Sequence, residues 1–246
     1  MYNKIYDFCK VRNVGSIYRN GLEYSPRVKF LLELTAELGL NPELHVFKVN
    51  DSNNGFNIIL CGNSTRIITA HHDIVNPDID NANDNSASVI NAIATKLLKP
   101  EVTVILLDGE EVGGLGAQYA ADQILAGEFG EVEWILNLEL TGRGGSTFFI
   151  GDYPGKLQDH IRGIFNCPIV STPFNDAVIF REHGIDSVVI NPLPILAKGI
   201  SQVRWEDSYL DYDMLFNCHT KKDTLDTIST EDMQKFVEEV IIPIIS

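Results

Sequence analysis

The chain has 246 residues, of which 44% are hydrophobic, and this is enough for one large α/β domain with a sizeable core. Its formal net charge of −15 argues against a nucleic-acid partner, because no cluster of Lys and Arg offsets the acidic side chains. No apolar run approaches the roughly 18 residues that span a bilayer, so we expect no membrane partner and a cytoplasmic location.

Helical and extended patterns alternate along most of the chain. In chain order the predicted elements are a helix over 25–40, strands over 44–49, 56–60 and 66–71, a helix over 86–99, a strand over 102–107, a helix over 116–127, a strand over 134–140, a helix over 155–166, a strand over 168–170, a helix over 176–184, a strand over 187–191 and a helix over 229–242. The segment 194–217 has no clear period, and we interpret it as a long functional loop.

This order predicts an α/β fold, a three-layer α/β/α sandwich around a mixed, mostly parallel central sheet. The first three strands are joined by short turns, which indicates an antiparallel edge. No linker composition divides the chain. We therefore expect a single catalytic domain over residues 1–246, with no separate lid domain.

Imidazole and carboxylate side chains follow several of these strands. They are His71, His72 and Asp73 after one strand, Asp84 in the next loop, Asp108, Glu110 and Glu111 after another, Glu139 near the end of a third, and His219 and Asp223 late in the chain. Ligands of open α/β sheets bind outside the carboxyl ends of the strands. The pattern therefore predicts a functional site at that end of the sheet.

The spacing of these residues indicates a metal site. His71 and Asp73 are two positions apart, so their side chains share a face of an extended chain and Asp73 can fix the imidazole tautomer. This spacing favours His71 over His72 as a ligand. Adjacent Glu110 and Glu111 cannot point the same way, so one can bind a cation while the other faces water. Oxygen and imidazole donors suit catalytic Zn²⁺, with Mn²⁺ or Co²⁺ as substitutes.

Five motifs carry a family resemblance, in the order TAHHD, NANDNSAS, DGEEVGGLGA, LNLEL and CHTKKDT. Together they resemble the zinc-dependent exopeptidases of the leucyl aminopeptidase and aminopeptidase Y type, over residues from about 66 to 224. Glutaminyl cyclases are relatives that share the fold. The resemblance implies a phosphorylase/hydrolase-like α/β domain that holds two zinc ions. The stretch FNDAVIFREHGIDSVVI also resembles the family's substrate-pocket region.

Carried over position by position, the resemblance implies five metal ligands. Asp84 would bridge both ions, His71 and Glu139 would complete one site, and Glu111 and His219 would complete the other.

The resemblance also implies roles for residues that do not bind metal. Glu110 would be the general base and Asp73 would orient His71. The family often has a cis peptide after the bridging aspartate, which here is the Asp84–Asn85 bond.

The resemblance leaves alternatives open. The position of Glu139 is usually aspartate in the family's aminopeptidases, and glutamate there is more typical of related carboxypeptidases. A carboxypeptidase also needs a cation for the terminal carboxylate of its substrate, for which Arg143, Arg181 or Arg204 could serve. The sequence DGEE also resembles single-zinc glutaminyl cyclases, although the GGLGA that follows favours the peptidase branch.

The sequence as a whole predicts a dizinc aminopeptidase that acts on short peptides through a metal-bridging water. A catalytically inactive metal-binding protein is the alternative from a different class. The preferred side chain, the physiological metal and whether the chain forms a homo-oligomer are left open.

Overall fold

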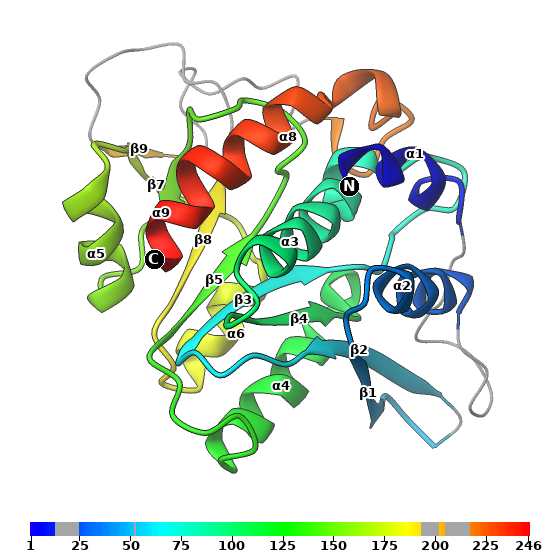
Figure 1. Ribbon diagram of the computed structural model, residues 1–246, viewed down its shortest axis with the longest axis horizontal. Helices are drawn as coiled ribbons and strands as arrows, with labels where there is room; N and C mark the ends of the chain where they lie inside the picture. Colours follow the sequence, from blue (N-terminus) through cyan, green and yellow to red (C-terminus); the bar gives the residue numbers. More distant parts are fainter. Residues whose placement is uncertain (13–24, 52, 193–201, 205–216) are drawn as a thin grey trace.

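The computed structural model describes residues 1–12, 25–51, 53–192, 202–204 and 217–246. The strands are β1 (Pro42–Lys48), β2 (Asn54–Leu60), β3 (Arg66–His71), β4 (Thr103–Leu107), β5 (Trp134–Leu138), β6 (Phe149–Gly151), β7 (Ile169–Ser171), β8 (Ser187–Asn191) and β9 (Gln202–Arg204). Within the described ranges they form one nine-stranded sheet in the order β1-β2-β4-β3-β5-β8-β6-β7-β9 (Figure 1). The predicted α/β fold with a mixed, mostly parallel sheet is confirmed.

The central strands β4, β3, β5 and β8 run parallel, whereas β1 and β2 form an antiparallel edge. Antiparallel pairing with β8 attaches β6, and β7 and β9 then continue in parallel. Carboxyl ends of parallel strands meet at one edge of a sheet. The residues that follow β3, β4, β5 and β8 therefore come together there.

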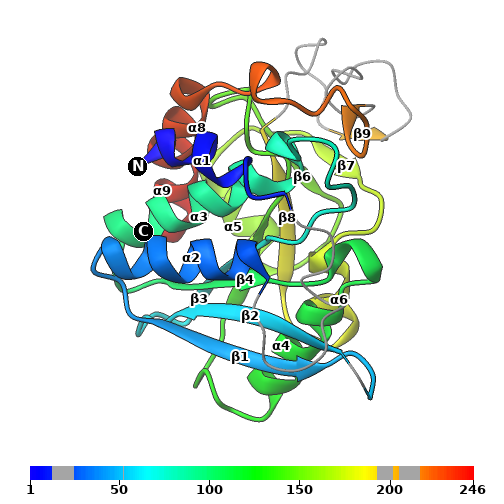
Figure 2. The same ribbon diagram turned by 90° about the vertical axis from the view of Figure 1, so that its right-hand side faces the viewer.

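Helices cover both faces of the sheet. Successive side chains of the inner strands point to opposite faces, and apolar residues on each face are buried by helices. The helices are α1 (Ile5–Phe8), α2 (Pro26–Glu37), α3 (Ala87–Leu98), α4 (Leu115–Leu125), α5 (Lys156–Ile164), α6 (Asp176–Glu182), α8 (Thr230–Phe236) and α9 (Ile242–Ile245). One face packs against α2, α3, α8 and α9, and the other against α4 and α6 (Figure 2). On β3, for example, Ile68 faces the first set and Ile67 the second.

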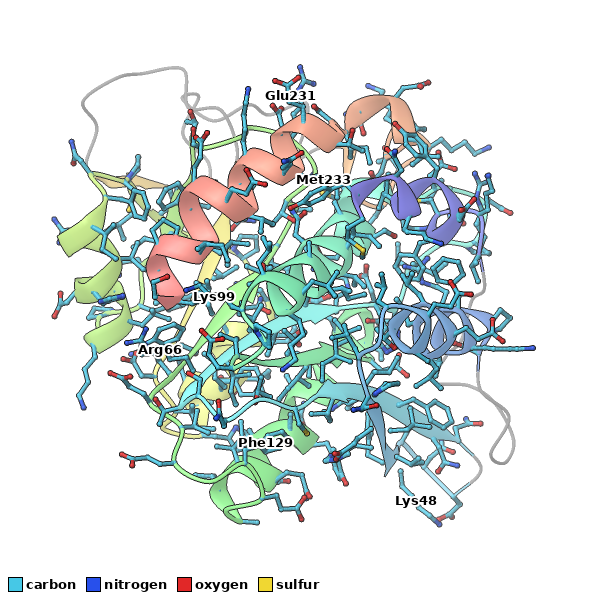
Figure 3. The ribbon with its side chains drawn as sticks, in the orientation of Figure 1. Lys48, Arg66, Lys99, Phe129, Glu231 and Met233 are labelled. Carbon is cyan, nitrogen blue, oxygen red and sulfur yellow. The ribbon has the colours of Figure 1, made fainter. Side chains whose placement is uncertain are left out.

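The C-terminal helix follows its predicted pattern. Ser229 is the N-cap, with its hydroxyl accepting from the backbone N–H of Asp232. Met233 is buried on the inner side of α8, whereas Glu231 points outward and pairs with Lys235 (Figure 3). Helical structure continues through a π-helical turn (Val237–Ile241) into α9, three residues beyond the predicted end at 242.

Several short elements were not predicted, because each is too short for a period to show. They are α1, β6 and β9. The strand predicted over 134–140 ends at Leu138, so Glu139 lies just beyond the strand rather than within it. Most of the loop predicted over 194–217 lies outside the described residues. Each helix in the described part of the chain is too short or too polar to span a bilayer.

The connection between β4 and α4 depends on close packing of Gly116. A Cβ at this position would overlap the backbone of Asp108 and the side-chain oxygen of Asn57. Both groups are fixed, since Gly116 N–H donates to Asp108 O and Asn57 Nδ2 donates to Gly116 O. Only a residue without a Cβ fits here.

The variant Gly116→Ala should therefore lower the free energy of unfolding by about 1–3 kcal/mol, because backbone atoms must move to make room. Gly163→Ala, in α5 and with nothing within 4 Å of its added Cβ, is the matched control. It should leave stability unchanged or raise it by up to ~1 kcal/mol. Urea unfolding of both variants measures the difference, and equal stability of the two would contradict the packing argument.

Candidate metal centre

His71 ends β3 and lies at the middle of a group of carboxylates. Its Nε2 is 3.3 Å from Asp84 Oδ1 and 3.5 Å from Glu139 Oε2, and its Nδ1 is 3.3 Å from Asp73 Oδ1. His72 points elsewhere, because successive side chains of a strand face opposite ways. Its Nε2 lies 2.9 Å from the carbonyl oxygen of Phe56, and burial lowers its pKa to about 4. The structure thus brings His71, and not His72, into the acidic group.

Asp84 lies in a π-helical turn (Ala82–Ser86) that leads into α3. Its two carboxylate oxygens face different histidines, since Oδ1 lies near His71 and Oδ2 is 3.0 Å from His219 Nε2. The backbone is held by Asp223, whose carboxylate accepts the N–H groups of Asn83 at 2.8 Å and of Asp84 at 3.1 Å. The expected cis peptide between Asp84 and Asn85 is present. Asp84 therefore lies between His71 and His219, with one oxygen facing each.

Glu110 and Glu111 lie in a 3₁₀ turn (Glu110–Val112) directly after β4. Gly109, with φ 82°, bends the chain into this turn through the left-handed region that glycine tolerates. Asp73 then fixes the turn, because its two oxygens accept the N–H groups of Glu110 at 3.2 Å and of Glu111 at 3.1 Å. Asp73 therefore joins the strand end that carries His71 to the two glutamates, and this contact to the turn was not predicted.

Glu139 follows β5 and is held by a chain of polar side chains. Asn137 Nδ2 donates to Glu139 Oε1 at 3.1 Å, and Thr69 Oγ1 donates to Asn137 Oδ1 at 2.7 Å. These bonds leave Glu139 Oε2 facing His71. Neither Thr69 nor Asn137 was singled out from the sequence, because an ordinary polar residue within a strand gives no local signal.

His219 completes the group from far along the chain. Its Nε2 is 3.0 Å from Asp84 Oδ2 and 3.0 Å from Glu111 Oε2, and these contacts raise its pKa to about 10. With 53% of its side chain exposed, it lies at the open side of the site. The same loop carries Asp223, so one loop supplies both an imidazole and the carboxylate that holds the Asp84 turn.

We call His71, Asp84, Glu110, Glu111, Glu139 and His219 the acidic centre. Within it, donor atoms lie no more than 4.8 Å apart in three groups, which are His71–Asp84–Glu139, Asp84–Glu111–His219 and His71–Glu110–Glu111. The first two groups share Asp84 and are the two ligand sets predicted from the sequence. The third shows that Glu110 lies beside them.

Electrostatics of the acidic centre favour bound cations. Burial, reinforced by Asp176, Glu139 and Glu111, raises the pKa of Glu110 to about 10. Burial also raises the pKa of Glu139, whereas Asp84 has a lowered pKa because contacts with His219 and His71 outweigh its burial. Ionised carboxylates packed this closely need positive charge near them. Nitrogen and oxygen donors at these positions fit a divalent metal such as Zn²⁺.

Asp176 is a site residue that the sequence did not identify, although the stretch containing it was linked to the substrate pocket. It is the first residue of α6 and fully buried, and neither carboxylate oxygen has a hydrogen-bond partner among the described residues. Burial raises its pKa well above the usual range, and it acts electrostatically on Glu110. Its role becomes apparent only in the folded chain, where it lies close enough to Glu110 to raise the pKa of that residue.

A cavity of about 340 Å³ opens onto the acidic centre. Its described lining consists of His71, Asp84, Glu110, Glu139, Leu140, Thr172, Pro173, Phe174, Asn175, Val189, Asn191, Cys218 and His219. Apolar side chains from several loops therefore form a pocket next to the carboxylates. This volume is at the small end of the range for ligand pockets.

Comparison with solved structures supports the fold. A zinc aminopeptidase from Bacillus subtilis has a TM-score of 0.60 and 22% identity, covering 80% of this chain and 50% of that one. The LapA aminopeptidase of Legionella pneumophila has a TM-score of 0.69 and 14% identity, covering 99% and 70%. A glutaminyl cyclase from Fimbriiglobus ruber has a TM-score of 0.71 and 17% identity, covering 99% and 93%.

The chain thus spans about half the length of the Bacillus aminopeptidase. A comparison with curated protein sequences found no significant match. The family comparison is decisive, because residues 59–242 match peptidase family M28 and this range contains every residue of the acidic centre. The chain therefore belongs to peptidase family M28.

Proposed function

We propose that this chain is a metal-dependent exopeptidase, a dizinc aminopeptidase of the leucyl aminopeptidase and aminopeptidase Y type that removes N-terminal residues from short peptides. The observation that carries the proposal is the pair of donor groups that share Asp84, with each of its oxygens facing a different histidine. Membership of peptidase family M28 and the similarity in fold to zinc aminopeptidases support it.

In this proposal His71, Asp84 and Glu139 hold one zinc ion, and Asp84, Glu111 and His219 hold the other. Bound there, the ions would polarise the scissile carbonyl and acidify a shared water, and their positive charge would keep Glu110 ionised.

Glu110 is the proposed general base. It lines the cavity next to His71, where a water attacking the substrate carbonyl has room. Glu110 would accept a proton from that water as the new C–O bond forms. It would then deliver the proton to the departing amine as the C–N bond breaks. Asp73 would support this step by holding the N–H of Glu110, which fixes the turn.

A glutaminyl cyclase that uses one zinc is the second candidate. The specific observation in its favour is length, since the alignment with the Fimbriiglobus enzyme covers nearly all of both chains. Two complete donor groups favour the dizinc peptidase, because a single ion needs only one of them.

A carboxypeptidase is less well supported. Its substrate carboxylate needs a cation, and none of the described residues that line the cavity is Lys or Arg. Arg181 lies elsewhere, bonded to the Pro154 carbonyl and to Asp186, and Arg143 is exposed and outside the lining. The side chain of Arg204 lies outside the described part of the chain.

The number of bound ions tests the two donor groups. Protein equilibrated with Zn²⁺ and then desalted should retain about two ions per chain, and His219→Ala should retain about one, because His219 belongs only to the second group. Elemental analysis of both proteins gives the count. A wild-type value of one would favour the cyclase.

The role of Glu110 is tested by Glu110→Gln, which keeps the shape of the side chain but cannot accept a proton. Hydrolysis of aminoacyl p-nitroanilides should fall about 10²–10⁴-fold while the zinc content stays that of wild type. Glu182→Gln, an exposed carboxylate at the end of α6, is the control and should keep full activity.

Two results would argue against this assignment. Undiminished hydrolysis by Glu110→Gln would remove Glu110 as the base. If the zinc-loaded wild-type protein cleaves no substrate in a broad panel of N-terminal residues, the aminopeptidase proposal fails, and formation of pyroglutamate from N-terminal glutamine would identify a cyclase instead. Metal binding without turnover of any substrate would favour the alternative, a catalytically inactive metal-binding protein.

A further inference from the structure

Arg27, near the start of α2, is a buried cation that touches two segments of the acidic centre. Only 1% of its surface is exposed. Its Nε donates to the carbonyl of His72 at 2.7 Å, and its Nη2 donates to Ser86 Oγ at 3.0 Å. A third bond, at 3.3 Å, runs from Nη1 to the carbonyl of Val11. One guanidinium therefore joins three parts of the chain that are distant in sequence.

Two of these parts carry groups of the proposed metal centre. The carbonyl of His72 lies between His71 and Asp73, and Ser86 ends the π-helical turn that holds Asp84. A guanidinium is planar and presents its donors in a fixed fork, so two bonds to separate segments set the distance between them. Arg27 thus fixes the end of β3 relative to the Asp84 turn.

The charge of Arg27 also requires an explanation. Among the described residues no carboxylate forms an ion pair with it, and burial lowers its pKa to about 10, against the opposing influence of Cys9, Asp73 and Asp108. The ring of Phe8 lies 3.8 Å below the guanidinium and offsets part of the cost. An apolar side chain of similar size would avoid this desolvation, so packing alone does not account for a buried cation here.

We infer that Arg27 is a positioning residue of the metal centre, which holds the His71–Asp73 segment and the Asp84 turn at the spacing that zinc binding needs. This inference rests on the proposed function. Arg27 precedes residues 59–242, the range matched by the family, so the N-terminal part of this chain contributes to a site built otherwise from the matched range.

A matched control exists in Lys96, another buried cation that bonds to carbonyl groups. Its Nζ donates to the carbonyls of Cys61, Pro100 and Val102. It lies near the far end of α3, roughly 15 Å along the helix axis from the Asp84 turn at 1.5 Å per residue. Replacing it removes a comparable set of bonds without touching the metal centre.

The experiment compares Arg27→Lys, Ser86→Ala and Lys96→Met with the wild-type protein. The dissociation constant for zinc is measured by competition with a chelator at 25 °C, together with the thermal midpoint of each metal-free protein. Arg27→Lys keeps the charge but loses the fork. It should weaken zinc binding by up to about 10–100-fold, the loss that follows when groups that orient metal ligands are replaced. Ser86→Ala, which removes one of the bonds, should weaken it less.

Lys96→Met should lower the thermal midpoint and leave the zinc dissociation constant unchanged. The inference is overturned if Arg27→Lys binds zinc as tightly as wild type, or if Lys96→Met weakens zinc binding as much as Arg27→Lys does. Zinc affinity does not depend on turnover, so an inactive protein that binds zinc would count against the proposed function but would still decide the role of Arg27. A wild-type protein that binds no zinc would overturn both.

Discussion

Repulsion between buried carboxylates is the constraint on which the arrangement of this molecule depends. Asp84, Glu111 and Glu139 lie within reach of one shared pair of histidines, with Glu110 and Asp176 close by. At a separation of 4 Å and an effective dielectric constant of 20, two like charges repel by about 4 kcal/mol. A few such pairs equal the whole stability of a typical domain, about 5–15 kcal/mol. Hydrogen bonds from neutral groups around the centre offset part of this cost, and bound cations would offset more of it.

The fold meets this constraint with donors that carry no negative charge. Asp73 is held by the backbone N–H groups of Glu110 and Glu111, and Asp223 by those of Asn83 and Asp84. In each case a carboxylate fixes a turn that presents another carboxylate. Main-chain amides at strand ends and helix starts thus hold the turns that carry Asp84, Glu110 and Glu111.

Much of this site could be predicted from the sequence, because its chemistry is local. His71 and Asp73 share a face of a strand, and Glu110 and Glu111 follow a strand of five buried residues. Residues whose roles depend on contacts with distant parts of the chain could not be predicted. Asp176 and Arg27 acquire their roles only when α6 and α2 pack against turns that are distant in sequence, and neither has a charged partner nearby in the chain. Asn137 is likewise an ordinary strand residue until the fold places it beside Glu139.

Glu139 shows how the surroundings decide what one extra methylene does. The sequence left the substrate end open, because glutamate stands where the family's aminopeptidases usually have aspartate. In the structure Asn137 takes one oxygen of Glu139 and leaves the other 3.5 Å from His71 Nε2, so the longer side chain still reaches the same group of donors. The backbone contributes as well, because Asn191 donates to the carbonyl of Glu139 and Leu140 adopts a positive φ directly after it. The extra length is therefore accommodated at Glu139 itself. None of the described residues that line the cavity is Lys or Arg, so no such side chain supports the carboxypeptidase alternative that glutamate at this position raises.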